Sequence, residues 1–98
     1  MNNVEFFEAL NAMEREKGIP AEYLAEKIQN AIIVTVKKDY GGEDVVHCTI
    51  DVDEQVFTVF VRKTVVAEVE NRFTELLIDE AKQHDKSAVV GGTVDIQL

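Results

Sequence analysis

Two pairs of adjacent basic residues are the groups in this chain best suited to binding an anionic partner. Lys37 and Lys38 form one pair, and Arg62 and Lys63 form the other. If the fold brought the pairs together, four positive charges would hold a phosphate backbone without reading its sequence. Alternatively, the charges are separate and solvated, and nearby carboxylates counter them, since short basic pairs are common on any surface. The residues alone leave both interpretations open.

The rest of the chain is acidic. Its 98 residues carry 19 Asp and Glu against 10 Lys and Arg, a net charge of −9. Phosphate repulsion would oppose a nonspecific nucleic-acid binder from most directions, although a local basic patch remains compatible with this balance. The ordinary explanation of the acidic excess is solubility.

The residue types that perform catalysis show no telling arrangement. His47 and His84 lie in unlike contexts, and each is expected at the surface or an interface rather than as a base or ligand. Cys48 is expected to be a buried, inert thiol. Ser87 has no histidine at a spacing that would make it a nucleophile. We therefore expect no enzyme, no cofactor and no small-molecule substrate.

An acidic cluster around Asp51, Asp53 and Glu54 superficially suggests a calcium loop. The loop requires glycine at its sixth position and glutamate at its twelfth, where this chain has Val56 and Arg62. The two glycine pairs are likewise not followed by the lysine and helix of a phosphate loop. No metal site is predicted.

The basic pairs must be positioned by helices and strands, and the first helix is predicted over residues 4–17. Its apolar stripe consists of Phe6, Phe7, Leu10 and Met13. Gly18 is placed to end this helix, because glycine takes the left-handed conformation without steric cost. Pro20 suits the first turn of a second helix. The two helices must therefore be neighbours.

The second helix lies within residues 19–40 and ends at Lys37 and Lys38. Its apolar positions are Leu24, Ile28, Ala31, Ile32 and Thr35. The β-branched residues in 32–36 favour a strand by propensity. We predict helix, because the 3.6-residue period continues without a turn signal. The extra apolar residues imply a second apolar face, which a sheet covers or a partner uses. Lysines at a helix C-terminus also favour the helix dipole, a sufficient structural reason for the pair.

Alternating residues predict strands in the second half of the chain. Residues 46–52 and 56–61 form a hairpin around a turn at 53–55, and the second strand is central because both its faces are apolar. Arg62 and Lys63 are interpreted as a bend or bulge before a third strand at 64–70. A connector at 71–75, a short helix at 76–83 and a last strand at 93–98 follow.

This order predicts an α+β fold with two N-terminal helices, three mostly antiparallel strands, a short helix and a final strand. We expect residues 1–98 to form a single domain, cut from a longer multidomain protein. No apolar run approaches the length that spans a bilayer, and the N-terminus lacks a secretory signal. With Cys48 as the only cysteine, nothing demands an oxidising compartment, and we expect a cytoplasmic protein without a membrane partner.

The landmarks, taken in order, resemble one known family. The segment EFFEALNAMEREKGIPAEYLAEKIQNAI leads into the lysine pair and Tyr40, and the segments TID, VVAEV, EAK and GGTV follow. This order and spacing is similar to the N-terminal domain of the bacterial transcription elongation and termination factor NusA, over nearly the whole chain. Two departures exist. The hairpin turn is shorter than in the family, and no serine or threonine precedes the short helix, which leaves Asp79 as a candidate cap.

The resemblance implies a domain that binds RNA polymerase at the flap of the β subunit, near the RNA exit channel. It implies that the domain enhances hairpin-dependent pausing and termination, with its basic side towards the nascent RNA hairpin. The S1 and KH modules of the family would follow residue 98. The alternative from another class is a free-standing protein-interaction or dimerisation module with incidental basic pairs.

The expected mechanism has two parts and involves no chemistry. An apolar groove on the first two helices would accept a polymerase helix. The groove residues would be Phe6, Phe7, Ile33 and Val36. The basic pairs would stabilise hairpin phosphates electrostatically, so that binding to RNA alone is weak and depends on salt. The RNA-contacting residues would be Lys37, Lys38, Arg62 and Lys63.

Overall fold

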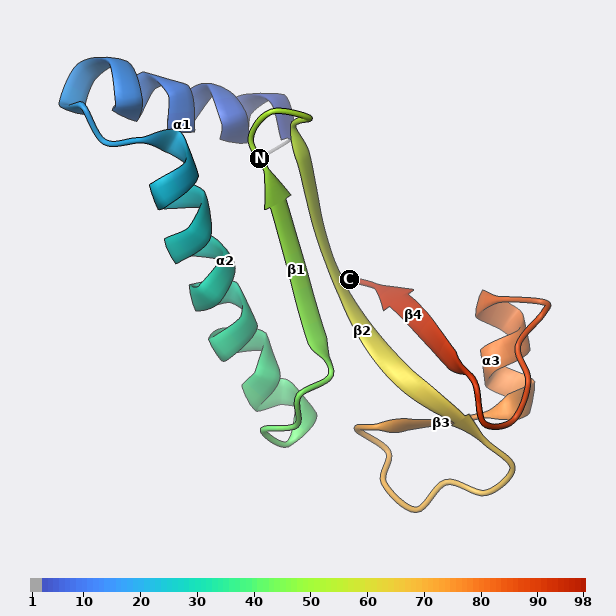
Figure 1. Cartoon of the computed structure of the whole chain (residues 1–98). Helices are drawn as coiled ribbons and strands as arrows, with labels where there is room; N and C mark the ends of the chain where they lie inside the picture. The colour runs from blue at the N-terminus through green and yellow to red at the C-terminus, as the bar shows by residue number, and fades with distance from the viewer. Residues whose placement is uncertain (1–2) are drawn as a thin grey trace.

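One long strand joins two packed regions in this protein. The computed structural model describes residues 3–98, and its principal extents are 53 × 26 × 19 Å. The radius of gyration is 16.6 Å, whereas a compact chain of this length would have about 13 Å. In chain order the elements are α1 (Asn3–Lys17), α2 (Ala21–Lys37), the 3₁₀ turn η1 (Lys38–Tyr40), β1 (Val46–Asp51), β2 (Val56–Val66), β3 (Glu75–Leu77), α3 (Ile78–His84) and β4 (Thr93–Gln97). Helices α1 and α2, the turn η1 and strand β1 gather along one half of β2, and β3, α3 and β4 gather along the other half (Figure 1).

The corner between α1 and α2 forms as its residues predict. Gly18 has a φ of +69°, and its N–H donates to the carbonyl of Glu14 at 3.0 Å. Pro20 lies at the N-cap of α2 rather than inside its first turn, and it has no side-chain group that could cap the helix. The carboxylate of Glu14 accepts a hydrogen bond from the N–H of Ala21 at 3.1 Å. The end of one helix thus caps the start of the next.

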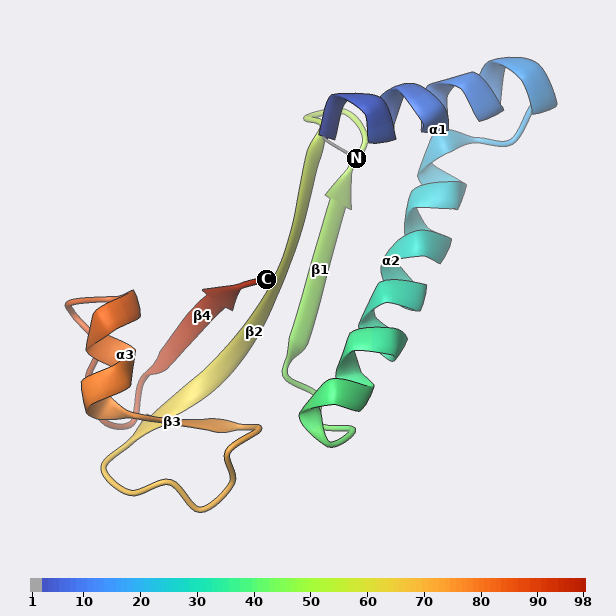
Figure 2. The same ribbon diagram turned by 180° about the vertical axis from the view of Figure 1, so that it is seen from behind.

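Helix α2 continues through residues 32–36, so the prediction of helix over strand is confirmed. Ala21 and Ala25 are buried on the side that meets the first helix and the hairpin, where their small side chains allow close approach. The side-chain carbonyl of Gln29 accepts the N–H of Ile50 at 3.1 Å, which ties α2 to β1. Figure 2 shows α2 running alongside β1 from behind. The helix ends through η1 at Gly41, whose φ is +65°.

The sheet is built on β2. Strand β1 pairs antiparallel with its first half, from Val46 opposite Val61 to Asp51 opposite Val56. Strand β4 pairs antiparallel with residues 60–64, and β3 pairs parallel with residues 64–66. The predicted α+β class, with a mostly antiparallel sheet and a central β2, is confirmed.

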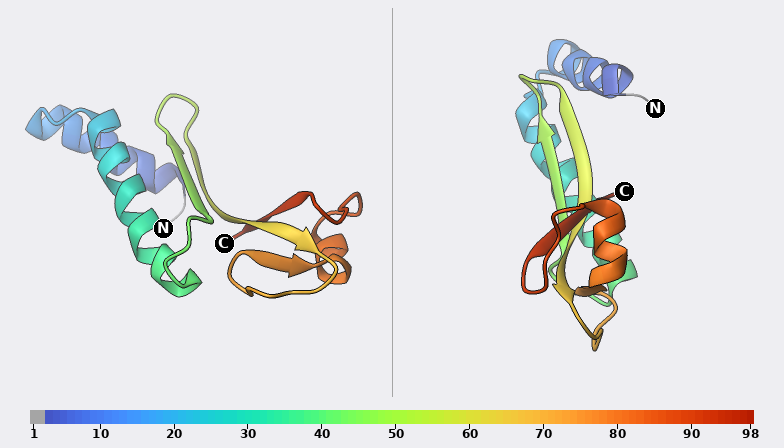
Figure 3. Two further views of the ribbon diagram at one scale, coloured as in Figure 1. Left: turned by 60° about the horizontal axis from the view of Figure 1, so that its bottom comes forward. Right: turned by 90° about the vertical axis from the view of Figure 1, so that its right-hand side faces the viewer.

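The predicted strand at residues 64–70 is wrong. Strand β2 runs without interruption from Val56 to Val66, and the third strand is β3, Glu75–Leu77. Strand β2 continues through Arg62 because this residue has a backbone partner on each edge of the strand. Its N–H donates to the carbonyl of Val45 at 2.9 Å, and it lies opposite Asp95 of β4. Strand β2 bends along its length without breaking (Figure 3).

The short helix begins later than predicted. Leu76 and Leu77 pair with β2 as part of β3, so α3 starts at Ile78. The expected cap by Asp79 is also wrong: α3 has Leu77 at its N-cap position and no side-chain capping bond. Asp79 lies in the first turn, where its charge favours the helix dipole.

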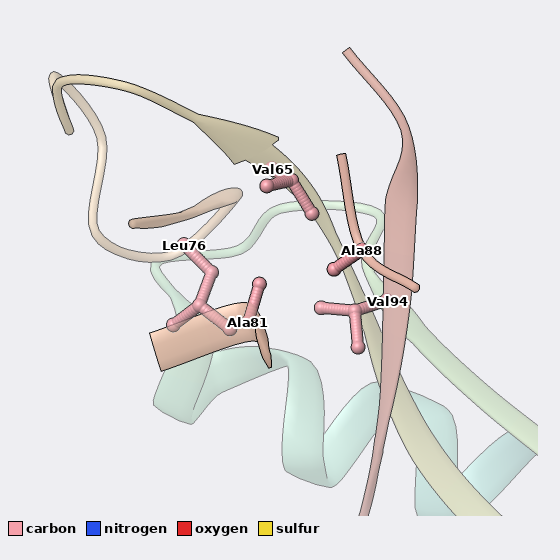
Figure 4. Close-up of a cluster of buried hydrophobic side chains, with 5 residues drawn as sticks. All are labelled: Val65, Leu76, Ala81, Ala88 and Val94. Atoms are coloured by element: carbon pink, nitrogen blue, oxygen red, sulfur yellow. The ribbon is translucent and has the colours of Figure 1, made fainter. Parts of the chain in front are cut away.

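The core consists of three clusters spread along β2. The first is formed by Phe7, Leu10, Ala21 and Ala25. The second is formed by Val45, Val46 and Val61, with Val36 and Tyr40 packed against it. The third lies around α3 at the other end and is formed by Val65, Leu76, Ala81, Ala88 and Val94 (Figure 4). The C-terminal half of β2 therefore packs against an apolar cluster of its own.

Candidate nucleic-acid interface

The first basic pair lies where α2 passes into η1. Lys37 is the last residue of α2, and its ammonium forms a salt bridge with Asp44, whose side chain is 92% exposed. The hydrogen bond and charge of Lys37 lower the pKa of the Asp44 carboxyl. Lys38 is exposed, and its side chain has no hydrogen bond or ion pair with any residue in the range 3–98. One lysine of the pair is thus countered by a carboxylate and the other is free.

The second basic pair is split between the two faces of β2, since successive side chains of a strand point to opposite sides. Arg62 forms a two-pronged contact with Asp95 of β4, at 2.8 Å from Nε and 3.3 Å from Nη2. Its guanidinium also lies 5.5 Å from the ring centroid of Phe60. This ion pair raises the pKa of Arg62 and lowers the pKa of Asp95. Arg62 is therefore a member of a cross-strand ion pair.

We expect the Arg62–Asp95 pair to make a small, pH-dependent contribution to folding stability. Because the pKa of Asp95 lies below its ordinary value of 3.8 in the folded protein, the contribution is present above that value and is lost as the pH falls through the folded pKa. Arg62→Gln should therefore lower the free energy of unfolding at pH 7, and the difference from the parent chain should vanish in strong acid.

Urea unfolding at a series of pH values measures this effect. Lys38→Gln is the matched control, because it removes the same charge from a residue without an ion-pair partner in the described structure. An Arg62→Gln difference that stayed constant across the pH range would contradict a role for the pair.

Lys63 points to the other face and meets the end of α2. Its ammonium donates to the backbone carbonyl of Arg72 at 2.8 Å and lies 5.6 Å from the ring centroid of Tyr40. The guanidinium of Arg72 lies 4.8 Å from the ring centroid of Phe73. The structure thus brings Lys63, but not Arg62, to the helix end that carries the lysine pair.

These groups line one open hollow of about 530 Å³, which we call the basic hollow. Its walls include Val36, Asp39, Tyr40, Lys63, Arg72 and Phe73. Arg72 and Phe73 come from the loop of residues 67–74, which has no periodicity that would mark them as site residues. The sequence did single out three other wall residues, Tyr40, Lys63 and Val36.

The four predicted groove residues occupy different environments. Phe7 is 1% exposed and belongs to the core. Phe6 is half-buried, and its ring makes edge-to-face contacts with Phe7 and Phe57 at centroid distances of 5.1 and 4.8 Å. Ile33 and Val36 are half-buried on α2. Phe7 is thus enclosed in the core, whereas the other three are each partly exposed.

An apolar stripe runs along α2 and shares Val36 with the predicted groove. Residues at helical spacing line a shallow hollow of about 270 Å³ whose walls are almost wholly apolar. They are Ile28, Ala31, Ile32, Thr35 and Val36, and we call them the α2 stripe. The sequence predicted most of these positions as the apolar face of the helix. Ala31 and Thr35 are exposed and Ile32 is half-buried, whereas Ile28 and Val36 are half-buried and also pack against the core.

Other site types find no support in the part of the chain that the structure describes. Within residues 3–98, no group of three or more His, Cys, Asp or Glu side chains could hold a metal ion. Cys48 is buried, and burial raises the pKa of its thiol, which disfavours the reactive thiolate. None of the described helices is both long and apolar enough to cross a membrane.

The chain is similar to one part of proteins described as transcription termination/antitermination proteins. The sequence profile described as the NusA N-terminal domain matches residues 5–98. The transcription termination/antitermination protein NusA of Halalkalibacterium halodurans is 34% identical over 96 residues, which cover 98% of this chain and 25% of that protein. The protein of the same description from Bacillus subtilis is 33% identical over 94 residues, which cover 96% of this chain and 25% of that protein. The chain thus spans about a quarter of the length of these relatives.

A solved structure has a similar fold. The solution structure of the N-terminal domain of NusA from Bacillus subtilis superposes with a TM-score of 0.64 at 32% sequence identity. The match covers 99% of this chain and 78% of that one.

Proposed function

This chain belongs to the NusA N-terminal domain family, and on that basis we propose that it binds RNA polymerase at the β-subunit flap and prolongs pausing at RNA hairpins. Its relatives are transcription termination/antitermination proteins. Neither activity requires a catalytic group. The two activities together require an apolar surface that docks on the polymerase and an adjacent positive surface that contacts the RNA. Both activities would take place in the cytoplasm.

The observation that carries this proposal is that an apolar surface and a basic surface adjoin at the end of α2. Val36 lines both the α2 stripe and the basic hollow. Lys37 and Lys38 follow it directly in the chain. A polymerase element on the stripe would therefore bring RNA emerging beside it close to the lysines.

The apolar half of the site combines the α2 stripe with the predicted groove residues that reach the surface. Ile33, Val36 and Phe6 are each half-buried, so each presents part of its side chain. Phe7 supports Phe6 from within the core. An amphipathic helix of the polymerase would dock here through anchors at helical spacing.

The cations in the basic half of the site differ in the partners that they already have within the protein. Lys38 is free of ion pairs within the described residues, and Lys63 contacts a carbonyl rather than a carboxylate. Lys37 and Arg62 would exchange Asp44 and Asp95 for RNA phosphates. The exchange costs little because exposed ion pairs are weak, and phosphate contacts release counterions.

Reversal of the lysine pair tests the RNA half of the proposal. We expect Lys37→Glu with Lys38→Glu to remove most of the pause prolongation at a hairpin-dependent site while polymerase binding persists. The measurement is pause half-life in a single-round transcription assay with purified polymerase. Lys82→Glu with Lys86→Glu is the control, because it makes the same change in net charge at α3 and the loop that follows it. Equal pausing by the parent and the Lys37/Lys38 variant would contradict the RNA half.

Co-purification tests the polymerase half. The immobilised chain should retain RNA polymerase and an isolated β-flap fragment, and Ile32→Asp in the α2 stripe should weaken this retention. Failure of the parent chain to retain either would overturn the assignment. A self-associating chain that did not bind polymerase would instead favour an interaction or dimerisation module.

A further inference from the structure

The basic hollow has the chemistry of a nucleotide site rather than of a simple phosphate patch. We infer that it takes one unpaired nucleotide of single-stranded RNA, held between η1 and the loop of residues 67–74. The inference deepens the proposed function, on which it rests for the supply of RNA, by naming the form of RNA that this hollow accepts. It involves Tyr40, Arg72 and Phe73, which lie outside the two basic pairs.

Two cations in the hollow are available to a phosphate. Lys63 uses one donor on the carbonyl of Arg72 at 2.8 Å and keeps the others. Arg72 is exposed, and no carboxylate among residues 3–98 pairs with it. Arg62 and Lys37, by contrast, are each held by an aspartate. Most Lys and Arg side chains of residues 3–98 likewise lack a carboxylate partner. Lys63 and Arg72 differ in sharing one hollow, where together they could hold a phosphate.

The same two cations lie over aromatic rings, which adds a flat surface to the positive charge. The guanidinium of Arg72 lies over Phe73 and the ammonium of Lys63 over Tyr40. The ring of Phe73 is packed against Gly41, where an added Cβ would stand 2.8 Å from Cδ2 of the ring. The contact with Gly41 therefore holds the Phe73 ring, over which Arg72 lies, in place. RNA bases stack on aromatic rings and on arginine planes.

Asp39 favours a nucleotide over a bare anion as the ligand of the basic hollow. Asp39 lines the hollow together with the two cations. A carboxylate repels phosphate, but it accepts hydrogen bonds from the amino and imino groups of a base. Apolar walls from Val36 and Phe73 suit a base and not an inorganic ion. The layout thus has cations for the phosphate and an acceptor for the base.

The shape of the site favours an unpaired base. A volume of about 530 Å³ is in the range of small-molecule pockets. A base within a duplex cannot leave its stack to enter a concave site at low cost, whereas an unpaired base can be splayed out. The hollow would therefore take RNA that flanks a hairpin stem or lies in its loop.

Fluorescence anisotropy with labelled oligonucleotides tests the inference on the whole chain. The probes are a cytidine hexanucleotide, an abasic ribose-phosphate oligomer of equal charge and a blunt RNA duplex. We expect the cytidine oligomer to bind more tightly than either of the others. Arg72→Gln and Lys63→Gln should each weaken its binding about fivefold and reduce the salt slope of log K by about 0.7, the value for one phosphate contact on a single strand.

Two further variants complete the test. Lys17→Gln, at the far end of α1, loses the same charge and should leave affinity and slope unchanged. Asp39→Asn should narrow the preference for cytidine over the abasic oligomer. Equal binding of the abasic oligomer, or of the duplex, would overturn the inference. So would an Arg72→Gln variant that binds as the parent does.

The outcomes separate this inference from the proposed function. Polymerase retention and pausing without preference for the cytidine oligomer would overturn the nucleotide site alone. Binding of the oligomer, with its dependence on Arg72, by a chain that does not retain polymerase would overturn the proposed function alone.

Discussion

Phe7→Ala should lower the free energy of unfolding by about 3–5 kcal/mol, the usual cost of removing a buried phenylalanine ring. The side chain is 1% exposed and packs with Leu10, Ala21 and Ala25 where α1 meets α2. A domain of this length is stable by only about 5–15 kcal/mol. The loss would therefore remove a large part of the total. Urea unfolding followed by circular dichroism measures it.

Met13→Ala is the control for this prediction, because it shortens another apolar side chain of the same helix. Met13 is 38% exposed, so its truncation should cost less than about 1 kcal/mol. Similar losses in the two variants would mean that Phe7 does not anchor α1. A destabilised α1 would also weaken polymerase retention, since Phe6 depends on Phe7 for its position.

Gly41→Ala should cost about 2–4 kcal/mol, from two separate penalties. The residue has a φ of +65°, which is unfavourable for any residue with a Cβ. The new Cβ would also stand 2.8 Å and 3.0 Å from two atoms of the Phe73 ring. The ring must move, and the loop of residues 67–74 should separate from the end of α2. Thermal unfolding, with NMR shifts of residues 67–74, measures both effects.

Gly42→Ala separates the two penalties. Its φ is +76°, but nothing lies within 4 Å of an added Cβ, so only the backbone cost of about 1–2 kcal/mol applies. In addition, Phe73→Ala should offset part of the Gly41→Ala loss, because it removes the ring that the Cβ would meet. Equal costs at Gly41 and Gly42 would contradict the ring contact.

The helical part of the fold could be predicted because its signals are local. In α2 the residues of 32–36 favour a strand individually, yet the 3.6-residue period from Leu24 onward decided the structure correctly. Gly18 ended α1 as its conformational freedom predicts. Each of these features depends on residues within one or two turns of each other.

The sheet was predicted less well because its pairing is not local. Arg62 and Lys63 suggest the end of a strand, but β2 continues past them, since β1 and β4 supply partners from distant parts of the chain. Strand β3 has three residues and pairs parallel with β2. A segment of three residues is too short for its sequence pattern to predict a strand.

In the candidate site, too, local features could be predicted from the sequence and contacts between distant segments could not. That Arg62 and Lys63 point to opposite faces follows from the two-residue period of a strand and was available from the sequence. Their partners, Asp95 and the carbonyl of Arg72, depend on tertiary pairing. Arg72 lies in an irregular loop, so only the folded chain could place it beside Lys63.

The shared strand β2 has a consequence for how the domain unfolds. Phe60 and Val61 are paired with β1 on one edge and with β4 on the other. The clusters on either half of the strand are small, and neither half can detach without exposing residues that serve both. We therefore expect a single cooperative unit whose slowest-exchanging amides lie at the middle of β2. A partner pulling on the two N-terminal helices would load β1 and, through it, the segment of β2 that also pairs with β4.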